Sequence, residues 1–489
     1  MTLNKVSFLI LLLSLAFLMT GCQGVGAGAP TSTSTATAQQ ANHIIFMMQE
    51  NRSFDAYFGK LNDFRAGQSL GRDLDALDTL FTVPADDSTT ISNFHLVTSC
   101  IFNTTAAWLE SHGDMNRFSP SDGNPLLLDG FSHTAGAQAQ NEGFADTKGV
   151  RSMGFYNGTD LNSPYFFATQ FATSDRWYAP APAQTEVVRL YAMAATSQGF
   201  VHPPQESNAT LSATTIFQLL DNAGVSWKIY SVDTDSTGKL ITSLNFFQPY
   251  GSTKQGHIFP ISQYFTDVQN GTLPQFAYIE PAFISGRDEH PGSGTNIQLG
   301  AQFMNSILTA LINSPSWKDS IFIETFDESG GLFDHVGPMI NGQSIQELSQ
   351  GASGQAVGPG KYPMDASAQH VPSPDGIMPK DLHPGDAQGD FTRTGFRVPL
   401  IIVSPFAKPH FVSHTPMDYT AVLRFVEKRF NLPNLTQRDA AQPDMSEFFD
   451  FVNAPNMNPS AAAQQNTGLG CDSTKASAAS GSTWTPPTS

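Results

Sequence analysis

Cysteine, basic residues and charge in general are scarce in this sequence of 489 residues. It contains 3 cysteines, and their spacing does not match a zinc–thiolate site. Only 14% of the residues are charged, which is low for a cytosolic protein. The 25 Lys and Arg residues stand against 43 Asp and Glu residues, which gives a formal net charge of −18. A chain this acidic repels phosphate backbones, so we expect no nucleic-acid partner.

The sequence also lacks a long hydrophobic run, except at its N-terminus. Lys5 precedes an apolar stretch, residues 6–19, that is typical of a secretory signal and not of a membrane span. The ending Gly21-Cys22 resembles the lipobox of bacterial lipoproteins, with Met19 where Leu is usual. The resemblance implies that Cys22 becomes the lipidated first residue of the mature protein. An ordinary signal peptide with an unmodified cysteine is the alternative.

These features predict a protein outside the cytoplasm. Residues 1–22 form a lipoprotein signal peptide, and residues 23–41, rich in Gly, Ala, Ser and Thr, form a flexible tether. We expect a bacterial lipoprotein held to a membrane by its lipid, in the periplasm or at the cell surface, or else a secreted protein. Cys100 and Cys471 are then left over. An oxidising compartment permits a disulfide between them, and two buried free thiols are the alternative.

Apolar residues are plentiful, since 40% of the chain is hydrophobic and 37 residues are Phe. Strand-like runs alternate with helix-like periods along the whole length, and no internal repeat is visible. This alternation predicts an α/β fold, a three-layer α/β/α sandwich with a mainly parallel sheet. We expect one domain, residues 42–455, with long loop insertions at 62–178 and 337–395, and a low-complexity tail at 456–489.

The stretch HIIFMMQENRSFDAYFG, residues 43–59, combines three local signals. An apolar run typical of a buried strand gives way at once to Glu50, Asn51 and Arg52. Ser53 then offers an N-cap for a short helix. Ligands bind at the carboxyl ends of strands in open α/β sheets, so we interpret this acid–amide–base group as a candidate site. A solvated turn is the alternative.

Acidic and imidazole side chains recur at the other expected strand ends. They are Glu280, Asp288, Glu289, His290, Asp327, Glu328, Asp334 and His335. A parallel sheet collects such ends at one edge, where clustered carboxylates repel one another unless a cation compensates them. Carboxylate, amide and imidazole groups are ligands of divalent metals, so the pattern predicts a metal site at this edge.

Thr185 lies at the start of an expected helix. Pro180 and Pro182 force an extended entry, and the apolar residues after Glu186 have helical spacing. An N-cap is the ordinary role of a threonine at such a place. The backbone N–H groups of a helix start also favour an anion, so the Thr185 hydroxyl is placed to attack a phosphate held there.

Four motifs in order resemble the bacterial phosphoesterase family. They read ENRSFDAYFG, DRWYAPAPAQTEVVRLYAMAATSQG, DEHP and TFDESGGLFDHV. The family contains phosphatidylcholine-hydrolysing phospholipases C and a related acid phosphatase. The resemblance extends over residues 43–451 and implies an alkaline phosphatase-like fold, in agreement with the sandwich expected above. It also implies a phosphoric ester hydrolase with a divalent metal ion of open identity.

The resemblance assigns a role to each matching candidate. The metal ligands that it implies are Glu50, Asn51, Thr185, Asp327 and Glu328. Thr185 also matches the nucleophile, and Asn51 a contact to the substrate phosphate. His290 and His335 match catalytic histidines near the scissile phosphate. His112 matches a histidine of the first insertion, which we expect to contact the substrate.

Val188 and Ser329 depart from the family pattern, which commonly has Asn and His at these places. The second departure leaves protonation of the leaving group to His290 or His335. The expected function is metal-assisted hydrolysis of phosphate esters, by phospholipase C-type cleavage of phospholipids or other phosphodiesters. An acid phosphatase acting on monoesters is one alternative. A catalytically inactive, surface-anchored binding protein on the same scaffold is another, and the lack of a sulfatase-like signature counts against sulfuryl transfer.

Overall fold

The structure of the protein is a computed structural model. It describes residues 41–472, apart from 119–125, 208–209, 293–294, 340–380, 383, 385, 387–390 and 392. The expected signal peptide, nearly all of the tether, much of the 337–395 insertion and the end of the tail lie outside the described residues. Among the helices that are described, none has both the length and the apolar character needed to cross a membrane.

The core of the fold is a sheet of 8 strands in the order β13-β6-β12-β11-β1-β10-β8-β9. Its strands are β1 (His43–Gln49), β6 (Ala172–Ser174), β8 (Trp227–Ser231), β9 (Ile258–Pro260), β10 (Phe276–Ile279), β11 (Ser320–Phe326), β12 (Leu400–Val403) and β13 (Phe411–Ser413). Neighbouring strands are parallel, except where β12 pairs with β11 and with β6. β1 lies between β10 and β11, and residues 44–48 are all buried, as expected of a strand covered on both faces.

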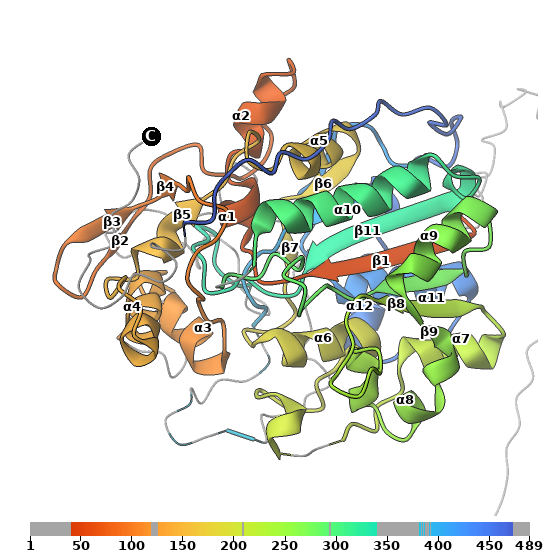
Figure 1. Ribbon diagram of the computed structural model, residues 1–489, viewed down its shortest axis with the longest axis horizontal. Helices are drawn as coiled ribbons and strands as arrows, with labels where there is room; N and C mark the ends of the chain where they lie inside the picture. The colour runs from red at the N-terminus through yellow and green to blue at the C-terminus, as the bar shows by residue number, and fades with distance from the viewer. Residues whose placement is uncertain are drawn as a thin grey trace, which may run out of the picture.

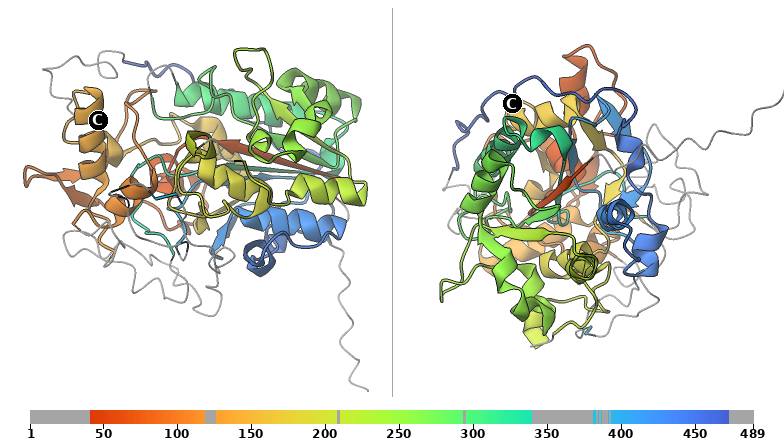
Figure 2. Two further views of the ribbon diagram at one scale, coloured as in Figure 1. Left: turned by 90° about the horizontal axis from the view of Figure 1, so that it is seen from below. Right: turned by 90° about the vertical axis from the view of Figure 1, so that its right-hand side faces the viewer.

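Helices cover both faces of this sheet. One layer contains α5 (Asn162–Gln170), α9 (Ile261–Asn270) and α10 (Ile297–Ile312). The other layer contains α6 (Thr185–Ala194), α7 (Ile216–Ala223), α11 (Thr420–Phe430) and α12 (Gln437–Ala441). The right-hand view of Figure 2 shows the sheet between α9 and α10 on one side and α11 on the other. The predicted three-layer sandwich with a mainly parallel sheet is confirmed.

A lobe built from the segment between β1 and β6 lies beyond the carboxyl ends of the strands. After α1 (Phe54–Phe58) and α2 (Leu61–Ala66), its elements are β2 (Thr82–Pro84), β3 (Thr90–Ser92), β4 (Phe94–His95), α3 (Trp108–Met115), α4 (Phe131–Glu142) and β5 (Gly154–Phe155). In Figure 1 the arrow of β11 points toward this lobe. A second apolar cluster, which includes Val83, Met115 and Phe131, fills it. The strand ends therefore face the space between sheet and lobe.

The C-terminal described segment, residues 456–472, runs along the outside of the α5 and α10 layer (Figure 1, dark blue). The backbone N–H of Leu469 donates to Gln298 on α10, and Asn162 on α5 donates to the backbone of Gln464. Cys471 forms a disulfide with Cys100, and their Cα atoms lie 5.2 Å apart. The sequence left pairing and free thiols open, and the structure shows pairing. Outside these layers, the described residues also form the strands β7 (Trp177–Tyr178) and β14 (Met417–Asp418), the helix α8 (Tyr250–Thr253) and several short 3-10 helices.

Candidate active site

A cavity of about 530 Å³ opens where β1, β10 and β11 end. The predicted site residues in its wall are Glu50, Asn51, Thr185, His290 and Glu328. Arg189 of α6, Phe283 and Phe246 line it as well. The lobe contributes a further part of the wall, which includes Thr105 and Gln138. The structure thus brings together residues that lie far apart in the sequence.

Thr185 and Asn51 meet in this wall. The Thr185 hydroxyl donates a hydrogen bond of 3.1 Å to the side-chain oxygen of Asn51. Asn51 has a positive φ of 58°, a left-handed conformation that asparagine tolerates better than most residues. The backbone at Gly330 packs closely against Asn51: a Cβ on Gly330 would lie 2.4 Å from the Asn51 carbonyl oxygen. The ordinary N-cap interpretation of Thr185 is wrong, because Gln184 is the N-cap and Thr185 is the first residue of α6.

Asp327 lies directly behind Asn51 and is fully buried (0% exposed). Its Oδ1 accepts hydrogen bonds from the backbone N–H groups of Asn51 at 2.9 Å and Glu328 at 2.8 Å. Its Oδ2 makes no hydrogen bond within the described residues. That oxygen lies 3.3 Å from Nε of Arg189, whose Nη2 donates to Glu50 Oε1 at 2.7 Å. One guanidinium therefore serves two carboxylates.

The electrostatics of this group favour a bound cation. Burial raises the pKa of Glu50 well above its usual value, and the charge of Asp327 raises it further. Burial and Asp327 act in the same way on the pKa of Glu328. Burial lowers the pKa of Arg189, but Glu50 and Asp327 outweigh burial and raise it. A single positive charge leaves these carboxylates under-compensated, so they fit a divalent ion with oxygen ligands.

His290 is the predicted catalytic histidine that lines the cavity. Its Nδ1 lies 2.5 Å from the carbonyl oxygen of Pro291, so this nitrogen carries the proton in the neutral ring. Burial lowers the pKa of His290. Burial also raises the pKa of the nearby Asp288 carboxyl to about 6. At neutral pH the ring is therefore uncharged, and its Nε2 is the atom that can take up or deliver a proton.

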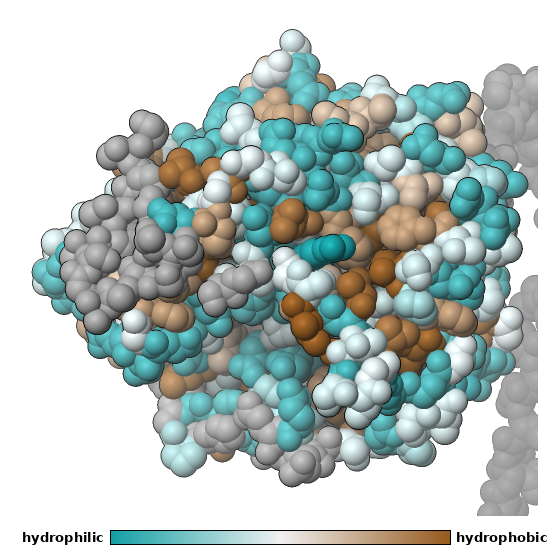
Figure 3. Space-filling model, in the orientation of Figure 1, coloured by the Kyte–Doolittle hydropathy of each residue, from teal (hydrophilic) through white to brown (hydrophobic). Residues whose placement is uncertain are grey.

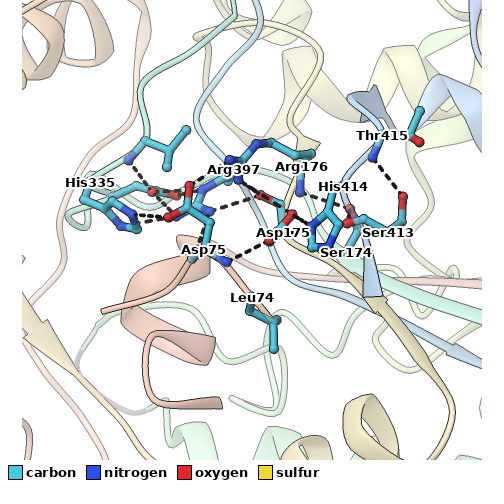
Figure 4. Close-up of polar contacts among 12 residues, drawn as sticks. Leu74, Asp75, Ser174, Asp175, Arg176, His335, Arg397, Ser413, His414 and Thr415 are labelled. Atoms are coloured by element: carbon cyan, nitrogen blue, oxygen red, sulfur yellow. Dashed lines mark hydrogen bonds and ion pairs between the residues drawn. The ribbon is translucent and has the colours of Figure 1, made fainter. Parts of the chain in front are cut away.

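His335 lies in a different group, outside the wall of this cavity. Its Nδ1 is 2.6 Å from Asp55 Oδ2 and its Nε2 is 3.0 Å from Asp75 Oδ1. Figure 4 shows the ring beside Asp75 and Arg397. Asp55, Asp334 and His335 bring three ligand atoms within 4.8 Å of one another, a spacing that can hold a metal ion. Nη2 of Arg397 already lies 2.6 Å from Asp334 and 3.1 Å from Asp55, so an ion there would compete with a guanidinium.

His112 is also buried outside the cavity wall. It lies on α3, and its Nδ1 is 2.6 Å from the carbonyl oxygen of Trp108. The roles expected of His112 and His335 stay predictions. Arg189 lies within the second of the four family motifs, but the motif by itself indicates no role for it. Arg189 lies one helical turn after Thr185 on the same face of α6, and this spacing is the sequence signal that could have placed it in the site.

The fold is an α/β sandwich, and its cavity brings together residues expected of an enzyme that hydrolyses phosphoric esters. The model of the Phosphoesterase family matches residues 41–433, which is most of the chain. The protein belongs to this family. The predicted family and enzyme class are thereby confirmed.

Several characterised proteins are similar to this chain. Phospholipase C B of Mycobacterium tuberculosis is 28% identical over 456 residues, which cover 85% of this chain and 78% of that protein. Non-hemolytic phospholipase C of Pseudomonas aeruginosa is 27% identical over 457 residues, which cover 86% of this chain and 58% of that protein. A solved protein of the alkaline phosphatase superfamily from Vibrio parahaemolyticus aligns over 84% of this chain and 80% of that chain, with a TM-score of 0.31 and 11% identity.

Proposed function

We propose that the protein cleaves phosphodiesters in the manner of a phospholipase C, with Thr185 as the nucleophile. The observation that carries the proposal is the hydrogen bond between the Thr185 hydroxyl and Asn51, inside a cavity that Glu50, Glu328 and Arg189 also line. Two sequence relatives are named phospholipase C, which supports phospholipid as the substrate class.

The nucleophile is oriented by its neighbours. The amide oxygen of Asn51 accepts the hydrogen bond that the Thr185 hydroxyl donates, so the hydroxyl oxygen has its lone pairs free to face the cavity. The start of α6 adds backbone N–H groups that the Gln184 side chain does not cap, and such groups attract an anionic phosphate. The Asn51 amide is a second group that can contact the phosphate.

The reaction has two displacement steps. The Oγ–P bond to Thr185 forms as the P–O bond to the alcohol breaks; the hydroxyl proton of Thr185 leaves to solvent, and protonated His290 gives its Nε2 proton to the departing oxygen. Water then attacks phosphorus and gives one proton to the imidazole, while the Oγ–P bond breaks and the Thr185 oxygen takes up a proton from solvent. A neutral His290 at pH 7 must first be protonated for the first step, so the proposal favours a mildly acidic optimum.

Glu50, Asn51, Thr185, Asp327 and Glu328 would hold the divalent ion. All five offer oxygen atoms, and Asp327 Oδ2 is a buried oxygen without a hydrogen bond in the described part of the chain. When bound, the ion supplies positive charge that stabilises the phosphate oxygens and lowers the pKa of the hydroxyl.

Thr185→Ala tests the nucleophile. We expect activity on p-nitrophenyl phosphorylcholine and on p-nitrophenyl phosphate to fall by about 10³-fold or more. The folded state should lose only about 1 kcal/mol with one hydrogen bond. Thr215→Ala is the matched control: Thr215 caps α7 away from the cavity, so its loss should leave the rates unchanged.

Each outcome of this assay decides something. Wild-type rates in Thr185→Ala would refute the assignment of Thr185 as the nucleophile. Wild-type activity on the monoester alone would favour an acid phosphatase. Activity that survives complete chelation would refute the proposal that the reaction needs a divalent metal ion. A wild-type protein without activity on either ester would favour a binding protein on this scaffold.

We propose further that Cys22 is lipidated and holds the enzyme at a membrane outside the cytoplasm. The lipobox-like sequence at residues 18–22 supports this. Metabolic labelling with a radioactive fatty acid should mark the wild-type protein and not Cys22→Ala. Equal labelling of both proteins would contradict the proposal.

A further inference from the structure

Glu280 has no part in the function proposed above, although it is one of the acids at a strand end. It follows β10 directly and is fully buried (0% exposed). Its Oε1 accepts hydrogen bonds from Thr242 Oγ1 at 2.9 Å and from the Ser243 N–H at 2.8 Å. Its Oε2 lies 3.6 Å from Nη1 of Arg189. Neither of these two atoms makes a hydrogen bond within the described residues, so the ion pair is what compensates them.

Arg189 is therefore surrounded by three carboxylates. Nη2 is 2.7 Å from Glu50 Oε1, Nε is 3.3 Å from Asp327 Oδ2, and Nη1 faces Glu280. Glu50 and Asp327 are proposed metal ligands, whereas Glu280 is not in the cavity wall. A guanidinium that satisfied only the two ligands would cancel much of the negative charge that attracts a divalent ion.

We propose that Glu280 is a positioning residue that shares the charge of Arg189, so that Glu50 and Asp327 stay available to a divalent ion. The inference rests on the metal site of the proposed function. Glu280 acts through Arg189 and is not a ligand, because the guanidinium lies between it and the two ligands. Thr242 and Ser243 do line the cavity, so the same carboxylate also ties that wall to the metal ligands.

Glu280→Gln removes the charge and keeps the shape. We expect the dissociation constant for Mn²⁺, and separately for Ca²⁺, to rise about tenfold or more, since partners behind metal ligands commonly contribute 10–100-fold. Isothermal titration of the chelator-treated mature protein measures this directly, without relying on activity. Saturating Mn²⁺ should restore kcat to nearly the wild-type value, which a damaged fold would not allow.

Glu324→Gln is the matched control. Glu324 is a second buried glutamate (1% exposed), on the central strand β11, which β1 separates from β10, and it is not paired with Arg189 in the described ion pairs. Its substitution should leave both dissociation constants within about twofold of wild type. Glu280→Asp keeps the charge and should bind the ions more tightly than Glu280→Gln.

The results separate this inference from the proposed function. Equal ion affinities of wild type and Glu280→Gln would overturn the inference and leave the proposed function standing. A wild-type protein that binds neither ion would overturn the inference and the metal site together. Should Glu280→Gln not fold, Thr242→Val decides: it removes one donor to Glu280, and an ion affinity equal to wild type would overturn the inference.

Discussion

Arg397 joins segments that are far apart in the sequence through one buried side chain. Its guanidinium pairs with Asp334 and Asp55 and donates to the backbone oxygens of Asp75 and Asp175. Figure 4 shows it between His335 and the Asp175 segment. Arg189 does the same at the candidate site with Glu50, Asp327 and Glu280. No local pattern predicts such contacts, because each partner comes from a different part of the chain.

Arg397→Met should destabilise the protein by about 3–5 kcal/mol, because it leaves Asp334 buried without its cation and takes one of the two positive partners, Arg397 and His335, from Asp55. Equilibrium urea unfolding measures the loss. Arg72→Met is the control: Arg72 pairs with Asp63 and Asp78 at the surface, where such pairs contribute about 0–1 kcal/mol. Equal losses for the two variants would contradict the importance of the buried group.

At the scale of elements, a strong hydrophobic pattern in the sequence predicted the strand or helix at that place. The strand expected within residues 43–59 is β1, and the helix expected to start at Thr185 is α6, so both lie where the sequence predicted them. The three-residue strands β6, β9 and β13 were not assigned, because such short pieces carry no period of their own. α4 was not predicted for a similar reason. Its residues are mostly small and polar and show no apolar period, and one face of the helix is buried only because it packs against the rest of the lobe.

The 456–472 segment has no helix or strand of its own and is fixed by the disulfide between Cys471 and the distant Cys100. Replacing both cysteines by serine should cost about 2–4 kcal/mol, because the bridge closes a loop of 371 residues in the unfolded chain. Limited proteolysis should then cut within 456–472 before it cuts the sheet. Identical digestion patterns of the two proteins would show that the hydrogen bonds to α5 and α10 suffice.

At the scale of the whole molecule, the His335 group connects the lobe to the sheet. Asp55 and Asp75 come from the segment that enters the lobe, and Arg397 directly precedes the β12 region. The ring of Phe81 stacks on His335 at 4.8 Å between centroids. Three charged segments and one aromatic ring therefore fix how the lobe sits over the strand ends.

Stability should fall at alkaline pH because of this group. Burial lowers the pKa of His335, but Asp55 and Asp75 outweigh burial and raise it to about 10. An unfolded histidine titrates near about 6.5, so the folded state binds this proton more tightly. The stabilisation is complete below about pH 6.5 and is lost as the pH rises through about 10. Urea unfolding between these values should show a steeper decline for wild type than for His335→Gln, and equal slopes would refute the assignment.

The sequence by itself determined the α/β class, the buried central strands, the family and most of the residues that gather at the cavity. These follow from local periodicity and from residue types placed at strand ends, which a parallel sheet collects at one edge. Only the tertiary structure decided that Cys100 meets Cys471, that His335 lies with Asp55 and Asp75 outside the cavity wall, and that Arg189 sits among three carboxylates. Each of these is a contact between distant segments, and the packing of the layers and the lobe sets its distance.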